Sequence, residues 1–361
     1  MEQNPMSKNS AENSDSEDVF LAHRFLDCLS GNWKTQAIYV AAELRIADLL
    51  SEGPRTSEDL AAVTGTHAPS LHRLLRALIT IDICRERQDG SFEITPMGSL
   101  LRTDVPGSLR SWTIWWGTNL WKVWENLLYS IKTGESARKL LLGTNGFKHL
   151  EKDPEAAAVF NRGLVELTRL TSKNVVRIYD FSGLKRIVDV GGGYGELLVS
   201  ILRASPATSG VLFDLPHAIE GGRRRLEEAG LASRCEFFEG NFFESVPKGA
   251  DAYILKSIIH DWDDEHSKLI LENCRRAMDG RERLLLVERV LPDRLEVSEA
   301  HQSAVRTDLS MLVAHAAKER TETEFRDILN SAGFRVARII PIGMTFNIIE
   351  AFPLNLNGRK T

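Results

Sequence analysis

The sequence predicts an α/β protein: a doubly wound, mostly parallel sheet that ends in an antiparallel hairpin and follows a mostly helical N-terminal part. Three observations predict this class. Short apolar runs alternate with helical stretches from about residue 184 onward. A glycine-rich turn, Gly191 to Gly195, follows the first apolar run. The length of 361 residues exceeds one average domain, so we expect two main domains.

The first part of the chain divides by composition and periodicity. Residues 1–18 are polar and acidic, and we expect a disordered tail there. In residues 19–110, four stretches with helical spacing precede a Gln-Asp-Gly hairpin signal, in the order of a winged helix: 33–44, 45–50, 56–65 and 69–78. A winged helix can read DNA, but residues 54–89 carry five arginines and five acidic residues. We therefore expect a packing or dimerisation module.

Residues 111–180 stay helical, and we expect a helical linker and substrate-pocket region with a long helix from Pro154. Five of the seven tryptophans lie between Trp112 and Trp124. They either pack in a core or form an aromatic wall over a flat ligand. The second interpretation makes four residues candidates for binding a flat aromatic substrate: Trp116, Phe160, Asn161 and Leu164.

Residues 181–361 carry the alternating pattern of a parallel sheet. We expect strands at 186–190, 210–214, 235–239, 250–256, 284–288, 336–340 and 346–350. Helices are expected between them at 196–203, 218–229, 264–278 and 322–331. Only a few residues around Gly343 join the last two strands, so these two should pair antiparallel.

The glycine-rich turn and an acidic residue downstream predict a nucleoside site. Glycines directly after a first strand let a ligand approach the backbone at the carboxyl edge of a sheet. Asp214 ends the second strand, where a carboxylate accepts hydrogen bonds from ribose hydroxyls. The spacing from Gly191 departs from the dinucleotide pattern G-x-G-x-x-G, and the Walker lysine is absent. These departures oppose an NAD dehydrogenase and favour a nucleoside cofactor without a pyrophosphate.

A candidate base follows the fourth strand. His260 lies in the string Lys256-Ser-Ile-Ile-His-Asp-Trp, at the same expected sheet edge. An imidazole is suited to take a proton from a hydroxyl, and a carboxylate can fix its tautomer. Glu288 ends the fifth strand, which we expect beside the fourth, and Glu322 follows as a second carboxylate. We predict His260, Glu288 and Glu322 as the catalytic group.

Composition excludes several classes of protein. The net charge of −5 makes tight nucleic-acid binding, including by a ligand-sensing transcription factor, a poor interpretation. No run approaches the roughly 18 apolar residues of a membrane span, and no signal-peptide pattern opens the chain, so we expect a cytoplasmic protein. The four cysteines form no CxxC pair, and neither a metal site nor a disulfide framework is predicted.

Taken together, the motifs resemble the S-adenosylmethionine-dependent small-molecule O-methyltransferases of the caffeate and hydroxyindole type, and the bacterial natural-product branch fits best. The resemblance covers roughly residues 20 to 352. Five strings carry it, in this order: Val188-Asp-Val-Gly-Gly-Gly-Tyr-Gly, Phe213-Asp-Leu-Pro, Gly240-Asn-Phe-Phe, Leu255-Lys-Ser-Ile-Ile-His-Asp-Trp and Lys318-Glu-Arg-Thr-Glu. It implies a Rossmann-like, seven-stranded methyltransferase sheet after a winged-helix dimerisation domain, a homodimer, and a role in secondary metabolism such as antibiotic biosynthesis.

The resemblance also implies residue roles. S-adenosylmethionine would contact these positions: Gly191, Gly193, Asp214, Leu215, Asn241, Phe242, Lys256 and Trp262. His260 would deprotonate a hydroxyl of a small aromatic or polyketide-like acceptor, with Asp261 on the substrate side. Two positions depart from the family pattern, which usually has Asp at 241 and Gly-Gly before Lys318, where this chain reads His315-Ala-Ala. His315 is then a substrate contact or simply a loop residue.

Other chemistry on the same fold and cofactor stays open. Relatives of this type also carry out C- or N-methylation, hydroxylation, decarboxylation or pericyclic reactions, and the fold does not separate these. The joint presence of His260, Glu288 and Glu322 favours O-methylation.

Overall fold

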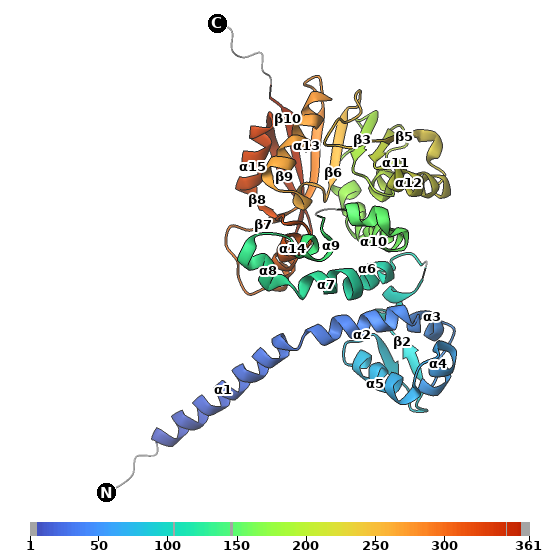
Figure 1. Ribbon diagram of the computed structural model, residues 1–361, viewed down its shortest axis with the longest axis vertical. Helices are drawn as coiled ribbons and strands as arrows, with labels where there is room; N and C mark the ends of the chain where they lie inside the picture. Colours follow the sequence, from blue (N-terminus) through green and yellow to red (C-terminus); the bar gives the residue numbers. More distant parts are fainter. Residues whose placement is uncertain (1–5, 104, 145–146, 344, 355–361) are drawn as a thin grey trace. The chain divides into compact units, whose positions relative to one another are not determined.

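The computed structural model describes residues 6–103, 105–144, 147–343 and 345–354. The chain forms two compact units, Met1–Gly117 and Thr118–Thr361, each described here by itself (Figure 1). The first unit therefore takes in the tryptophans as far as Trp116 and ends a few residues beyond the boundary expected at 110.

The first unit is mostly helical with a short hairpin. Its elements are α1 (Met6–Leu29), α2 (Asn32–Glu43), α3 (Ile46–Ser51), α4 (Ser57–Thr64), α5 (Ala68–Ile79), β1 (Cys84–Glu86), β2 (Phe92–Ile94), η1 (Gly98–Leu101) and α6 (Arg110–Trp115). Where we expected a disordered tail over residues 1–18, residues from Met6 onward belong to α1, and residues 1–5 lie outside the described part.

Helix–helix–hairpin packing holds this first unit together. The Thr56 side chain caps α4 by accepting a hydrogen bond from the Asp59 amide. The Asp59 carboxylate in turn accepts from the Thr56 amide, which completes a capping box. On α5, Leu71, Leu75 and Leu78 recur at helical spacing and are fully or almost fully buried. The predicted succession of helices and hairpin is therefore confirmed.

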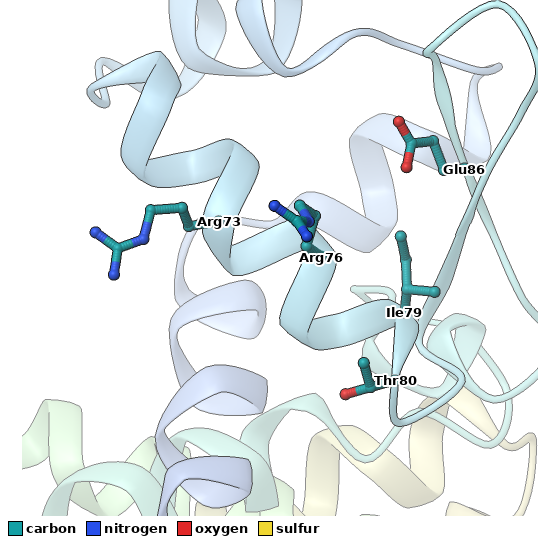
Figure 2. Close-up of a pocket in the computed structure, with 5 residues that line it drawn as sticks. All are labelled: Arg73, Arg76, Ile79, Thr80 and Glu86. Atoms are coloured by element: carbon teal, nitrogen blue, oxygen red, sulfur yellow. The ribbon is translucent and has the colours of Figure 1, made fainter.

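A shallow hollow of about 410 Å³ lies beside α5 in this unit (Figure 2). Arg73 and Arg76 project from the helix beside it, and Glu86 of β1 stands across from them. His72, also on α5, packs edge-on against Phe92 of the hairpin at 5.8 Å.

The second unit begins with short helices and continues as a helix–sheet–helix sandwich. A π-helical turn at Trp116–Leu120 crosses the boundary. The helices are α7 (Trp121–Trp124), α8 (Leu127–Thr133), α9 (Ala137–Leu142), η3 (Lys148–Lys152), α10 (Pro154–Ile178), α11 (Glu196–Ala204), α12 (Pro216–Glu228), η4 (Ala232–Arg234), η5 (Ile259–Asp261), α13 (Asp264–Arg276), α14 (Glu299–His315) and α15 (Glu322–Ser331).

The strands of the second unit form one sheet in the order β5-β4-β3-β6-β7-β10-β9, with β8 pairing β7 beside this path. They are β3 (Arg186–Val190), β4 (Ser209–Asp214), β5 (Cys235–Glu239), β6 (Ala252–Lys256), β7 (Arg283–Leu291), β8 (Arg320–Thr321), β9 (Phe334–Gly343) and β10 (Phe346–Pro353). The strands β3 to β7 are parallel, and β10 pairs antiparallel with both β7 and β9. The predicted sheet and its terminal hairpin are confirmed.

Helices cover both faces of this sheet because side chains alternate along each strand. On β6, Tyr253 and Leu255 join the core under α13 and α15, whereas Ile254 joins the core under α10 and α11. Both sets are fully or almost fully buried. Since β6 and β7 are neighbours, the residues that follow β6 lie beside the later part of β7, at the edge where the candidate site is found.

Candidate active site

The glycine-rich turn after β3 is built around backbone conformations that other residues rarely adopt. Gly191 has φ +68°, and a Cβ there would lie 2.6 Å from the Ile258 side chain. Gly193 has φ +57°, and a Cβ there would meet nothing within 4 Å, so its outer side is open. The Gly193 amide donates to Oδ2 of Asp214 at 2.7 Å. The two motifs that predicted a nucleoside site are thus joined directly.

Asp214 is held at the end of β4 and can still accept further hydrogen bonds. Its Oδ1 accepts from the Leu215 amide at 2.6 Å, which places Leu215 at the start of α12. Each carboxylate oxygen keeps a second lone pair for a ligand. Behind the turn, Asp189 is buried, and its Oδ2 has no hydrogen-bond partner among the described residues. These acceptors and the open glycine turn fit a nucleoside whose hydroxyls donate to Asp214.

Aromatic rings stand beside the turn. Phe242 comes within 3.4 Å of the Cβ position built on Gly191. Trp262 packs edge-on against Phe243 at 4.7 Å and against Phe242 at 6.1 Å. Asn241 accepts the Phe243 amide at 3.0 Å through its Oδ1, so its side chain closes the turn after β5. An Asn fulfils this local role as an Asp would.

Lys256 ends β6 between the glycine turn and the candidate base. Burial lowers the pKa of its ammonium group to about 8, against the opposing pull of the Glu288 carboxylate. Its Nζ donates to Oγ of Ser257 at 3.2 Å. Ser257 itself has φ +54°, a left-handed conformation that costs a non-glycine residue energy and tends to occur at functional sites.

His260 lies on the 3₁₀ turn η5, directly after β6. Its Nδ1 donates to Oε1 of Glu319 at 2.9 Å, and the Glu319 side chain is fully buried. The Glu319 amide in turn donates to Asp308 at 2.9 Å, which anchors the carboxylate from α14. A carboxylate on Nδ1 leaves Nε2 as the nitrogen that accepts a proton.

The predicted carboxylates play different structural parts. Glu288 is fully buried on β7, and its Oε1 accepts the amides of Ile258 and Ile259 at 2.9 and 2.8 Å. It thereby holds the turn that carries His260. Glu322 does not contact His260, because it is the first residue of α15, is half-exposed and pairs with Arg326 at 2.8 Å.

Glu319, and not the predicted Glu322, contacts His260 for a local reason. Thr321 caps α15 and forms a capping box with Glu324. The helix therefore starts after Thr321, and Glu322 projects outward from its first turn. Glu319 precedes the cap and the two-residue strand β8, which runs beside the end of β7. The Thr-x-x-Glu signature was present in the sequence and would have assigned Glu322 to a helix surface.

Arg320 holds the backbone of η5 in place. It is 1% exposed, and its guanidinium donates to the carbonyls of Ile259 and Trp262 at 2.8 and 2.9 Å. It also pairs with Asp264 at 2.7 Å. Because Glu319 precedes it directly, the same short segment holds both the backbone and the imidazole of the His260 turn.

The carboxylates around His260 favour the charged form of its imidazole. Burial opposes the charge of His260, but the carboxylates of Glu319, Asp261 and Glu288 outweigh it and raise the pKa of the imidazole to about 10. Burial raises the pKa of Glu288 to about 7 and that of Asp261 to about 6, with the His260 charge opposing both shifts. The site therefore stabilises the imidazolium that proton transfer to His260 would create.

Asp261 and His315 lie beside the base. Oδ1 of Asp261 is 3.6 Å from Nε2 of His260 and 3.8 Å from Nε2 of His315. His315 ends α14 and is followed by Ala316 in the left-handed conformation, so it is a helix residue rather than the loop residue that we considered. Arg138 on α9, which sequence reasoning did not single out, donates to Nε2 of His315 at 3.4 Å.

An aromatic group extends from His315. The ring of Phe147 lies 4.9 Å from His315, 5.5 Å from Phe160 and 6.4 Å from Trp262. Phe147 was missed because it stands alone in sequence, with no periodicity or motif around it. The structure thus brings Phe160, a predicted substrate residue, into one group with His315.

The remaining predicted substrate residues lie on α10 and in the first unit. Asn161 is buried, and its Nδ2 donates to the Ala157 carbonyl at 2.9 Å within α10. Leu164 lies one turn further along α10 and is partly buried. Trp116 belongs to the first unit, whereas His260 belongs to the second.

Comparisons with family models and with known proteins all point to one family. Residues 124–335 match the family model of the O-methyltransferase domain, and residues 26–104 match that of the O-methyltransferase dimerisation domain. The phenazine O-methyltransferase PhzM of Lysobacter antibioticus is 42% identical over 95% of this chain and 99% of the relative. The phenazine-1-carboxylate N-methyltransferase of Pseudomonas aeruginosa is 32% identical over 91% and 97%.

A solved structure shows the same fold with its ligands. It is an O-methyltransferase from neocarzinostatin biosynthesis in complex with S-adenosylmethionine and 2-hydroxy-5-methyl naphthoic acid. It is 32% identical, covers 89% of this chain and 96% of its own, and superposes with a TM-score of 0.76. The matched domains, the identity along nearly the whole chain and this fold place the chain in the O-methyltransferase family of S-adenosylmethionine-dependent enzymes.

Proposed function

We propose that this enzyme transfers a methyl group from S-adenosylmethionine to a hydroxyl of a small aromatic natural product, with His260 as general base. The observation that carries the proposal is the hydrogen bond from Nδ1 of His260 to the buried Glu319. It fixes the imidazole with Nε2 free to accept a proton, at the sheet edge that also holds the glycine turn.

The residues around the glycine turn suit the methyl donor. Asp214 would accept the ribose hydroxyls, while Phe242 and Trp262 would lie against the adenine ring. Gly191 and Gly193 leave the backbone open to the methionine end. S-adenosylmethionine supplies a methyl group already activated by a sulfonium. The protein must therefore orient the acceptor and remove its proton.

The proton has a defined destination. The acceptor hydroxyl gives its proton to Nε2 of His260, and the positive charge that results faces the carboxylates of Glu319, Asp261 and Glu288. Glu319 contacts the ring directly, whereas Glu288 acts through the backbone of the turn. This arrangement makes proton uptake favourable, and it requires that His260 start the reaction in its neutral form.

A flat acceptor fits the surroundings of the base. Phe147 packs against His315, and Phe160 and Trp262 pack against Phe147, so a group of aromatic rings extends from His315. Aromatic faces provide large apolar area and stacking geometry for a planar ring. Two of the compared proteins are named for phenazines, and the third was solved with a naphthoic acid. These names support a fused aromatic acceptor for this enzyme.

The experiment that tests the function is incubation with labelled S-adenosylmethionine and a panel of phenolic polyketides, hydroxyphenazines and hydroxyindoles. We expect a product about 14 Da heavier than the acceptor, with NMR placing the methyl on oxygen. A methyl on nitrogen would instead favour the chemistry named for the Pseudomonas aeruginosa relative, and a methyl on carbon would likewise contradict O-transfer. An altered product without added methyl would indicate hydroxylase, decarboxylase or pericyclase-like chemistry.

We further propose that the enzyme works as a homodimer. The matched dimerisation domain supports this, and so does α1, where Phe20, Phe25 and Leu29 are 61%, 67% and 67% exposed. Large apolar side chains gathered on one helix mark an association surface. Sedimentation velocity should give twice the chain mass, and Phe25→Asp combined with Leu29→Asp should give the single-chain mass.

No helix within the described residues is both long enough and apolar enough to cross a membrane.

A further inference from the structure

Arg138 stands out as a buried cation that the proposed chemistry does not use. Its side chain is on α9 and is 3% exposed. Within the described part of the chain, its guanidinium makes one hydrogen bond, from Nη1 to Nε2 of His315, and no ion pair within 4.0 Å. Burial lowers the pKa of the guanidinium to about 10, and the charge of Asp261 only partly opposes this shift. Burying a guanidinium without an ion pair is costly, so a partner is expected when the site is filled.

His315 presents an unsatisfied donor in the same place. Because Arg138 donates to Nε2, that nitrogen uses its lone pair, and the ring proton resides on Nδ1. Burial lowers the pKa of His315 well below its usual value, and the positive charge of Arg138 adds to this effect, so the ring is neutral. Its Nδ1 is buried and has no hydrogen-bond partner among the described residues.

His315 lies close to the base. The Asp261 carboxylate is next to both histidines, with its Oδ1 at 3.6 Å from Nε2 of His260 and at 3.8 Å from Nε2 of His315. The Phe147 ring packs at a tilt against the His315 ring, with centroids 4.9 Å apart, so the same place also has an aromatic side chain. A group bound by Arg138 would therefore sit on the same small aromatic molecule whose hydroxyl faces His260.

We propose that Arg138, together with His315, binds a carboxylate carried by the aromatic acceptor, so that the preferred substrates are hydroxyarene carboxylates. This inference rests on the proposed function and names its substrate class. A carboxylate offers acceptors only, which matches the two donors that Arg138 and Nδ1 of His315 present, and its two oxygens fit the planar guanidinium fork. A neutral ester or an unsubstituted ring would leave the buried guanidinium unpaired.

The test compares a hydroxynaphthoic acid, its methyl ester and the parent naphthol as acceptors. We expect kcat/KM for the acid to exceed that for the ester and the naphthol by about tenfold to a hundredfold, the effect of one hydrogen bond to a charged group. Calorimetry with S-adenosylhomocysteine-bound enzyme should show the same preference in acceptor Kd. Equal values for acid and ester in both assays would overturn the assignment.

Two variants localise the effect. Arg138→Gln should raise KM for the acid about tenfold to a hundredfold and leave KM for the ester unchanged. Arg138→Lys should restore part of the preference for the acid over the ester. The matched control is Lys139→Gln, since Lys139 is the next residue, is exposed and pairs with Glu135. It should keep the full preference.

The two proposals fail in different ways. If ester and naphthol are O-methylated as well as the acid, or if Arg138→Gln keeps the preference, the carboxylate site is wrong and the methyltransferase function stands. If the acid binds in an Arg138-dependent way but no acceptor gains an O-methyl group, the carboxylate site stands and O-methylation is wrong. If Arg138→Gln does not fold, Arg138→Lys and the acid–ester comparison in the unmodified enzyme still decide.

Discussion

Replacing Glu319 by glutamine removes the carboxylate charge from Nδ1 of His260 while keeping the size and hydrogen-bonding capacity of the side chain. The bond is 2.9 Å long, and the Glu319 side chain is fully buried, so solvent does not screen the interaction. A hydrogen bond to a charged group contributes about 1.5–3 kcal/mol. At about 1.4 kcal/mol per pKa unit, the pKa of His260 should fall by about one to two units.

The direction of the pH effect follows from the required protonation state. The carboxylates raise the pKa of His260 to about 10, and the base must be neutral to accept a proton, so kcat/KM should rise with pH through that region. In Glu319→Gln the rising limb should move to lower pH by about one to two units, and its plateau should drop about tenfold to a hundredfold. The Kd for S-adenosylmethionine should not change.

The assay is product formation followed by mass spectrometry from pH 6 to pH 10.5, repeated with two acceptors of different hydroxyl pKa. A limb that belongs to His260 stays in place when the acceptor changes. Glu322→Gln is the matched control, because Glu322 is half-exposed and pairs with Arg326, and it should leave the profile unchanged. A limb that moves in Glu322→Gln, or fails to move in Glu319→Gln, would refute the reasoning.

Three further outcomes are expected. His260→Ala should reduce turnover by about 10²–10⁴-fold and leave calorimetric binding of S-adenosylhomocysteine intact; unchanged turnover would contradict a role as base. Arg320→Met should lower the free energy of unfolding by about 1–3 kcal/mol, measured by urea unfolding, because the carbonyls of Ile259 and Trp262 lose a charged donor. Fluorescence should show that the folded fraction binds cofactor normally. Gly191→Ala should weaken S-adenosylhomocysteine binding about tenfold, since φ is +68° and the Cβ would meet Ile258. Gly183→Ala, at a position without a positive φ and with open space around it, should leave the Kd unchanged. Equal Kd values for the two variants would contradict cofactor binding at the glycine turn.

The architecture could be predicted because it depends on patterns that local sequence carries. Apolar alternation along β6 and β7 places side chains in two cores, and the helix over residues 322–331 was expected with the bounds that the structure has. The glycine turn and Asp214 could also be joined in advance, because carboxyl ends of parallel strands meet at one edge. The helix α14, Glu299–His315, was not foreseen, and His315 was therefore considered as a loop residue.

The catalytic neighbourhood was predicted only in part. His260 and Glu288 stand at adjacent strand ends, as expected, but Glu288 holds the backbone of the turn and Glu319 holds the ring. Two glutamates three residues apart are equivalent by motif. Which one faces inward depends on where α15 begins.

The sequence by itself determined the fold class and indicated the candidate nucleoside site and the candidate base, because each follows from periodicity or from a motif at a strand end. Only the tertiary structure decided which carboxylate orients His260, and that Arg138 and Phe147 gather around His315. Arg138 and His315 are far apart in the chain. They meet because α9 packs against the end of α14, and no local pattern records such a contact.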